Sequence, residues 1–112
     1  MFGCKVFVQP QAEIDLLIAY QGLEDRWAGR GNDFFRAIDD WLDETKREPE
    51  RHPVIHQEYD TELRQALVPE FPYRIFYTVN EDAIVIMACF KVSDRYELED
   101  HFKIMDRCKR KG

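Results

Sequence analysis

The hydrophobic positions along the chain change their spacing near Pro10, where a short strand gives way to a helix. Residues 5–8 form a β-type run that ends at Gln9-Pro10. From Ala12 onward, apolar residues recur three and four positions apart, as they do on one face of a helix. We therefore predict a helix over residues 12–27. Its wide apolar face consists of Ile14, Leu16, Leu17, Ile18, Tyr20, Leu23 and Trp27.

A second helix is predicted over residues 33–47. Residues 29–32, Gly-Arg-Gly-Asn, break the first helix; Asn32 is the expected N-cap of the second, and Pro49 stops it. The two helices should form a hairpin, because the break between them is short. The apolar face of the second helix is Phe34, Ile38, Trp41 and Thr45, and its solvated face carries Asp39, Asp40, Asp43 and Glu44. The hairpin is expected to cover one face of a sheet with Trp27, Phe34 and Trp41.

The second half of the chain has the patterns of β-strands. Residues 54–59 and 63–68 are two candidates. Residues 73–79 are rich in aromatic and β-branched residues, with Tyr73 and Tyr77 on one predicted face and Arg74 on the other. Residues 83–90 form a continuous apolar run, which is typical of a central strand covered on both faces. The polar residues between these two runs predict a hairpin turn.

The order of these elements indicates the fold class. Helices that precede a succession of hairpin-linked strands are typical of an α+β domain with a mainly antiparallel sheet. A last helix is expected after Ser93 or Asp94, since apolar residues recur at helical spacing at Leu98, Phe102, Met105 and Cys108. We predict a single domain over residues 1–112, in which a two-helix hairpin packs on a small, mainly antiparallel sheet, with a C-terminal helix.

Composition and charge narrow the class of protein. The 112 residues are 45% hydrophobic and 34% charged, which suits one soluble globular domain. The net charge of −6 disfavours non-specific binding to nucleic acid. No apolar stretch reaches the roughly 18 residues of a membrane span, and the first residues lack the pattern of a signal peptide. Cys4, Cys89 and Cys108 are widely separated, so we expect reduced thiols in a cytoplasmic protein.

The most specific pattern is a pair of runs over residues 71–79 and 83–89, FPYRIFYTV and AIVIMAC. Together with residues 6–16, the second predicted helix, His52-Pro53 and Glu62-Leu63-Arg64, this pattern resembles the RelE/ParE superfamily. The members of that superfamily are the toxins of type II toxin–antitoxin modules, also called plasmid stabilisation proteins. The resemblance covers roughly residues 4–96 of the chain, and it implies the same α+β domain that the order of elements predicts.

The resemblance implies one of two activities. RelE-like members are ribosome-dependent endoribonucleases that cut messenger RNA, whereas ParE-like members poison DNA gyrase and have no nuclease site. Both kinds are held inactive by an antitoxin whose extended segment wraps the toxin. The expected partners are therefore a cognate antitoxin and, as the target, DNA gyrase or the ribosome with its mRNA. A homodimer is a further expectation for the protein without its antitoxin.

For the nuclease branch, the resemblance also implies catalytic residues. Attack by a ribose 2′-hydroxyl needs a general base, a general acid and cations near the phosphate. Arg74 matches the Tyr-Arg position of the family, and Arg64 matches an arginine on the preceding strand. The family's late catalytic positions fall near Lys91, Arg95 and Tyr96. Arg64 and Arg74 could both point into one concave sheet face; the alternative for each is an ion pair with a carboxylate such as Glu58 or Glu70.

The sequence favours the ParE-like branch. Where the nucleases of the family have His-Gly-X-Arg, this chain has residues 91–94, Lys-Val-Ser-Asp, so that an acid enters the expected cluster of cations. The chain is also acidic, whereas the nucleases tend to be basic. We therefore predict a toxin that inhibits its target by protein binding. An RNase toxin and a non-toxic interaction module on the same scaffold are the alternatives.

Other candidate sites have simpler interpretations. His52 and His56 are spaced as metal ligands on a helix would be, but Pro53 favours an extended chain and no third ligand is evident. Residues 29–31 could hold a phosphate before a helix, although a turn between helices is the favoured interpretation. Cys89 lies in an apolar run and is expected to be a small buried residue. We predict neither a metal nor a cofactor.

Overall fold

The described residues form two long helices, five strands and a short C-terminal helical segment. The computed structural model describes residues 5–93 and 103–107. Strand β1 (Lys5–Val8) leads into helices α1 (Pro10–Arg26) and α2 (Arg30–Arg47). The remaining strands are β2 (Val54–Glu58), β3 (Thr61–Leu67), β4 (Tyr73–Asn80) and β5 (Ala83–Lys91), and residues 103–107 form a short helical segment. Within these residues, no helix is both long and apolar enough to cross a bilayer.

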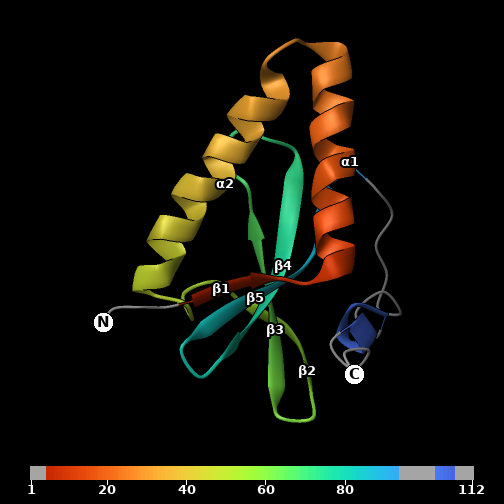
Figure 1. Ribbon diagram of the computed structural model, residues 1–112. Coiled ribbons are helices and arrows are strands. Elements are labelled where there is room, and N and C mark those ends of the chain that lie inside the picture. The colour runs from red at the N-terminus through yellow and green to blue at the C-terminus, as the bar shows by residue number, and fades with distance from the viewer. Residues whose placement is uncertain (1–4, 94–102, 108–112) are drawn as a thin grey trace.

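The strands form one sheet in the order β1-β5-β4-β3-β2. Strand β1 lies at an edge and runs parallel to β5, with Val6 opposite Ile84. The other neighbouring strands pair antiparallel. Figure 1 shows α1 and α2 as a hairpin on one side of this sheet, with the segment 103–107 placed apart from them. The predicted α+β fold, with a mainly antiparallel sheet and a C-terminal helix, is confirmed.

The sheet is covered on both faces. On one face, aromatic side chains of α2 pack against β4, with Phe34 next to Tyr73 and Trp41 next to Tyr77. On the other face, Ile104 and Met105 cover a second cluster, which contains Leu63, Phe76, Met87 and Ala88. Strand β5 therefore contributes to both cores, as its unbroken apolar run predicts.

The predicted apolar face of the first helix is wrong in part. The residues of α1 that pack on the sheet are Ala12, Leu16, Ala19 and Leu23. Ile14, Leu17 and Ile18, by contrast, are 49%, 56% and 67% exposed. Helix α1 has apolar residues on two opposite sides, and its small alanines allow that side to approach the sheet closely. Spacing alone could not tell which side is buried.

The turn between the helices also differs from the prediction. Trp27 is 73% exposed rather than packed on the sheet, because α1 ends at Arg26 and Trp27 adopts an extended conformation. Helix α2 begins at Arg30, and its N-cap is Gly29, with a φ of 89°, rather than Asn32. The Glu24 carboxylate accepts hydrogen bonds from the N–H groups of Gly29, at 2.8 Å, and Gly31, at 2.9 Å. The chain's own carboxylate thus occupies the place of an anion at the start of α2.

Candidate functional site

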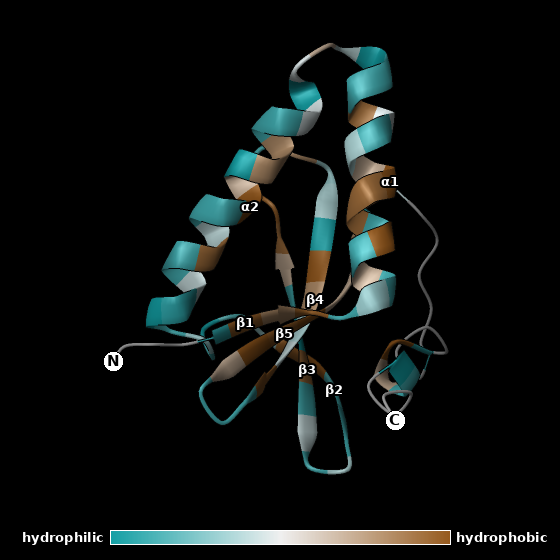
Figure 2. Ribbon diagram, viewed as in Figure 1, coloured by the Kyte–Doolittle hydropathy of each residue, from teal (hydrophilic) through white to brown (hydrophobic). Residues whose placement is uncertain are grey.

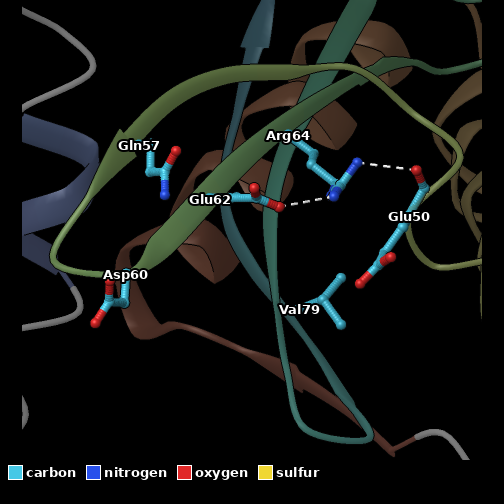
Figure 3. Close-up of a pocket in the computed structure, with 6 residues that line it drawn as sticks. All are labelled: Glu50, Gln57, Asp60, Glu62, Arg64 and Val79. Carbon is cyan, nitrogen blue, oxygen red and sulfur yellow. Dashed lines mark hydrogen bonds and ion pairs between the residues drawn. The ribbon is translucent and has the colours of Figure 1, made fainter.

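Arg64, the candidate arginine of β3, holds the loop that connects α2 to β2. One nitrogen of its guanidinium donates to the carbonyl oxygens of Glu50, at 2.9 Å, and His52, at 2.7 Å. The other donates to the Glu62 carboxylate at 2.9 Å. The side chain is only 10% exposed. These bonds engage both terminal nitrogens with groups of the protein itself (Figure 3).

An open cavity of about 160 Å³ lies beside this arginine. Figure 3 shows its lining residues, which are Glu50, Gln57, Asp60, Glu62, Arg64 and Val79. The lining contains more carboxylates than cations, and the Arg64 guanidinium is already paired with Glu62. A phosphate placed here would meet net negative charge, which opposes its binding. The lining contains no Ser, Thr, Cys, His or Lys, so its candidate general bases are the carboxylates of Glu50, Asp60 and Glu62.

Arg74, the candidate arginine of β4, binds the backbone of Val92, which follows β5. Its guanidinium donates to the carbonyl oxygen of Val92 at 3.0 Å and to the side-chain oxygen of Gln65 at 3.4 Å. In the sheet it lies opposite Leu67 on one side and Phe90 on the other. The alternative of an ion pair with a carboxylate is confirmed for Arg64, although its partner is Glu62 rather than Glu58 or Glu70.

Arg64 and Arg74 lie on opposite faces of the sheet. Arg64 is opposite Tyr77, whose ring belongs to the core under the helices. Side chains alternate between the two faces of a strand, so Arg74, three residues before Tyr77 in β4, points to the other face. Arg74 and Tyr77 are about 10 Å apart along the strand. The expectation that both arginines point into one concave face is therefore wrong.

Lys91, the other candidate among the described residues, does not join either arginine in a cluster of cations. Lys91 is opposite Tyr73, which places it on the helix-covered face, away from the face of Arg74. Arg95 and Tyr96 lie outside the described residues. Among the described candidates, the sheet thus does not bring Arg64, Arg74 and Lys91 together around one point.

An aromatic cluster that the sequence interpretation missed lies near Arg64. The imidazole of His52 stacks on Trp41, with ring centroids 5.8 Å apart, and meets the edge of Tyr77 at 6.1 Å. Burial lowers the pKa of His52 below its ordinary value of 6.5, and the charges of Arg51 and Arg64 lower it further, against an opposing effect of Glu44. Burial raises the pKa of Tyr77, whose hydroxyl donates to the carbonyl oxygen of Pro49 at 2.8 Å. Trp41 and Tyr77 were predicted core residues, but nothing local in the sequence relates His52 to them.

The sheet face that carries Arg74 is covered by residues 103–107. The guanidinium of Arg107 donates to Asp15 Oδ2, at 2.9 Å, and to the carbonyl oxygen of Met87, at 2.7 Å. The same Asp15 oxygen accepts the backbone N–H of Cys89 at 3.2 Å. Ile104 and Met105 of this segment pack on the cluster around Phe76. This packing covers apolar surface beside Arg74 that an open nucleic-acid groove would expose.

The described residues contain neither a reactive Cys89 thiol nor a metal site. Cys89 is a buried residue, as predicted, and burial, with a contribution from Asp15, raises its thiol pKa to about 12, so the thiol is a poor nucleophile at neutral pH. Within residues 5–93 and 103–107, no group of three or more His, Cys, Asp and Glu side chains could hold a metal ion.

The chain was compared with known families and with curated proteins. It matches no family model, and no curated protein matches it. Its class is thus defined by its own geometry: a small α+β protein in which the described sheet arginines bind the protein's own backbone and side chains.

Proposed function

We propose that the protein is a toxin of the ParE-like kind, which inhibits its target by protein binding and is neutralised by a cognate antitoxin. The sequence resemblance supports the toxin assignment, above all the hairpin formed by β4 and β5. The proposed target is DNA gyrase, and the proposed location is the cytoplasm.

A single observation carries the choice of protein binding over RNA cleavage. Arg64 and Arg74 point to opposite faces of the sheet, and both guanidiniums donate to acceptors of the protein itself. Stabilisation of a phosphate in the transition state requires preorganised donors aimed at one point. Half of the residues that line the cavity next to Arg64 are acids, and the whole chain has a net charge of −6. These features oppose a site for RNA.

Exposed apolar side chains favour a protein partner. Scattered apolar residues are normal on a surface, but contiguous ones usually mark an interface. Ile14, Leu17 and Ile18 are contiguous on α1, and Trp27 is exposed at the tip of the helical hairpin. These residues give the protein apolar contact area that lies away from both arginines.

The proposal is tested by induced expression together with two assays on the purified protein. Wild type should arrest growth and inhibit supercoiling by gyrase, and mapping of messenger-RNA ends should show no new cleavage. Arg74→Ala should arrest growth as wild type does, because Arg74 has no catalytic role in this mechanism.

Each of the other outcomes assigns a different function. New messenger-RNA ends that disappear in Arg74→Ala would identify a RelE-like nuclease. Growth arrest without cleavage and without gyrase inhibition would place the toxin on another protein target. Expression without any growth arrest would leave the non-toxic interaction module.

A further inference from the structure

Helix α1 has an apolar face on the side opposite the sheet. Successive helical residues are rotated by about 100°, so Ile14, Leu17 and Ile18 lie across the helix axis from Ala12 and Ala19. The alanines are buried and the three larger residues are exposed. We call these three residues the outer face of α1. Figure 2 shows the corresponding run of hydrophobic residues in the N-terminal half of the helix.

The outer face of α1 is unusual for a surface helix. Such a helix normally turns its apolar stripe to the core and its charged residues to water. Helix α2 follows this rule, since its exposed residues include Asp39, Asp40 and Asp43. Helix α1 instead exposes aliphatic side chains at a spacing that a second helix can contact, as in helix-in-groove recognition.

A glycine one turn after Ile18 leaves room for close approach. A Cβ atom built on Gly22 has no atom within 4 Å apart from the adjacent backbone of its own helix, and the φ of Gly22 is not in the left-handed region. The fold therefore does not require glycine at this position, although glycine weakens a helix relative to alanine. A glycine on an exposed helix surface allows the backbone of a partner to approach closely.

The charges around the outer face are acidic. Residues 10–22 contain no Lys or Arg. Glu13 lies beside the outer face, and Asp25 follows in the last turn; both are exposed, and the first basic residue of the helix is Arg26, at its end. A second copy of this chain would bring the same acids against these ones, and two chains that each have a net charge of −6 repel. Charge complementarity therefore selects a basic partner.

We propose that the outer face of α1 binds an amphipathic helix of a partner protein. Apolar side chains of that helix cover Ile14, Leu17 and Ile18, and its lysines or arginines lie next to Glu13 and Asp25. The inference rests on the proposed function only in that both require a protein partner, and it concerns a surface distinct from the arginines of the sheet.

The probe for this surface is a labelled helical peptide of about 20 residues, long enough to be helical in water. It carries one stripe of leucines flanked by lysines, and a matched peptide has glutamates in place of the lysines. By fluorescence anisotropy, wild type should bind the lysine peptide, more weakly as salt increases, and should not bind the glutamate peptide. Leu17→Gln and Ile18→Gln should each weaken binding about tenfold, since each removes buried apolar contact.

Two further variants distinguish binding at the outer face of α1 from nonspecific binding of the peptide to exposed apolar residues. Gly22→Ala should raise the Tm of the protein and yet weaken peptide binding, which a purely structural role of Gly22 would not produce. Leu67→Gln is the matched control, because Leu67 is an exposed apolar residue of β3. That variant should bind the lysine peptide as wild type does.

Three results would overturn the inference. The first is that Leu17→Gln binds the lysine peptide as tightly as wild type does, and the second is that wild type binds both peptides equally. The third is that sedimentation shows a homodimer of wild type that Leu17→Gln dissociates. The last result would identify a second copy as the occupant. If wild type inhibits gyrase but fails to bind the peptide, the docking surface is wrong and the proposed function stands. If the peptide binds as expected and wild type neither arrests growth nor inhibits gyrase, the proposed function is wrong and the docking surface stands.

Discussion

The carboxylate of Asp15 and the guanidinium of Arg107 lie 2.9 Å apart, although 92 residues separate them in the chain. Their side chains are mostly buried, and each makes one more hydrogen bond to β5, through Cys89 N–H and the carbonyl oxygen of Met87. Gln9 also donates to the backbone carbonyl of Arg107 at 3.1 Å. The pair thus joins α1, strand β5 and residues 103–107.

Removal of the Asp15 carboxylate should destabilise the protein. Asp15→Ala leaves a mostly buried guanidinium without its counter-ion and a strand N–H without its acceptor, so we expect a loss of about 2 kcal/mol in the free energy of unfolding. Urea denaturation measures this loss. Glu44→Ala is the control: its exposed ion pair with Arg51 spans 3.9 Å, and its loss should cost less than about 0.5 kcal/mol. Equal stability of Asp15→Ala and wild type would contradict the role of this pair.

The two sheet arginines should differ in their effect on stability. Arg64→Lys should lower the free energy of unfolding by about 2 kcal/mol, because a lysine cannot reach the carbonyls of Glu50 and His52 and the Glu62 carboxylate together. Arg74→Lys, whose bonds are more exposed, should cost about 1 kcal/mol. Chemical denaturation of both variants under identical conditions tests the order. A larger loss in Arg74→Lys would show that Arg64 does not hold the loop.

The stability of the protein should depend on pH through His52. Its pKa in the folded protein is lower than the ordinary value of 6.5, so below that value the unfolded chain binds more protons at this residue. Its contribution to stability is complete at neutral pH and is lost as the pH falls through the folded pKa. The Tm of wild type should therefore fall more between about pH 7.5 and about pH 5 than that of His52→Phe. Parallel curves for wild type and His52→Phe would refute the prediction.

Three glycines near the helical hairpin should respond differently to substitution by alanine. At Gly31, a Cβ would lie 2.7 Å from the Tyr20 ring and 2.9 Å from Glu24 Oε1, so we expect a loss of about 1–3 kcal/mol. At Gly29, the positive φ makes alanine unfavourable by about 1 kcal/mol. Gly22→Ala should gain about 0.5–1 kcal/mol, because the site is helical and open. Thermal unfolding of the three variants measures the order, and a destabilised Gly22→Ala would contradict it.

The local patterns of the sequence determined the elements and much of the core. Alternation in residues 73–79 placed Tyr73 and Tyr77 on one face, and both are buried under the helices. The apolar run of β5 predicted a strand covered on both sides, and Ile84 and Met87 belong to the two opposite cores. These predictions succeeded because burial of apolar surface acts on each element with the period of its own backbone.

The tertiary structure decided which side of α1 is buried and on which face of the sheet each arginine lies. Apolar residues on two sides of α1 made its burial ambiguous until packing on β5 selected the alanine side. Arg64 and Arg74 belong to different strands, and their relative faces depend on a register that pairs Arg64 with Tyr77. A shift of one residue in that pairing would reverse the face, and no residue near Arg64 in the sequence specifies it. The contact of Asp15 with Arg107 has the same origin, since only the folded chain brings the two charges together.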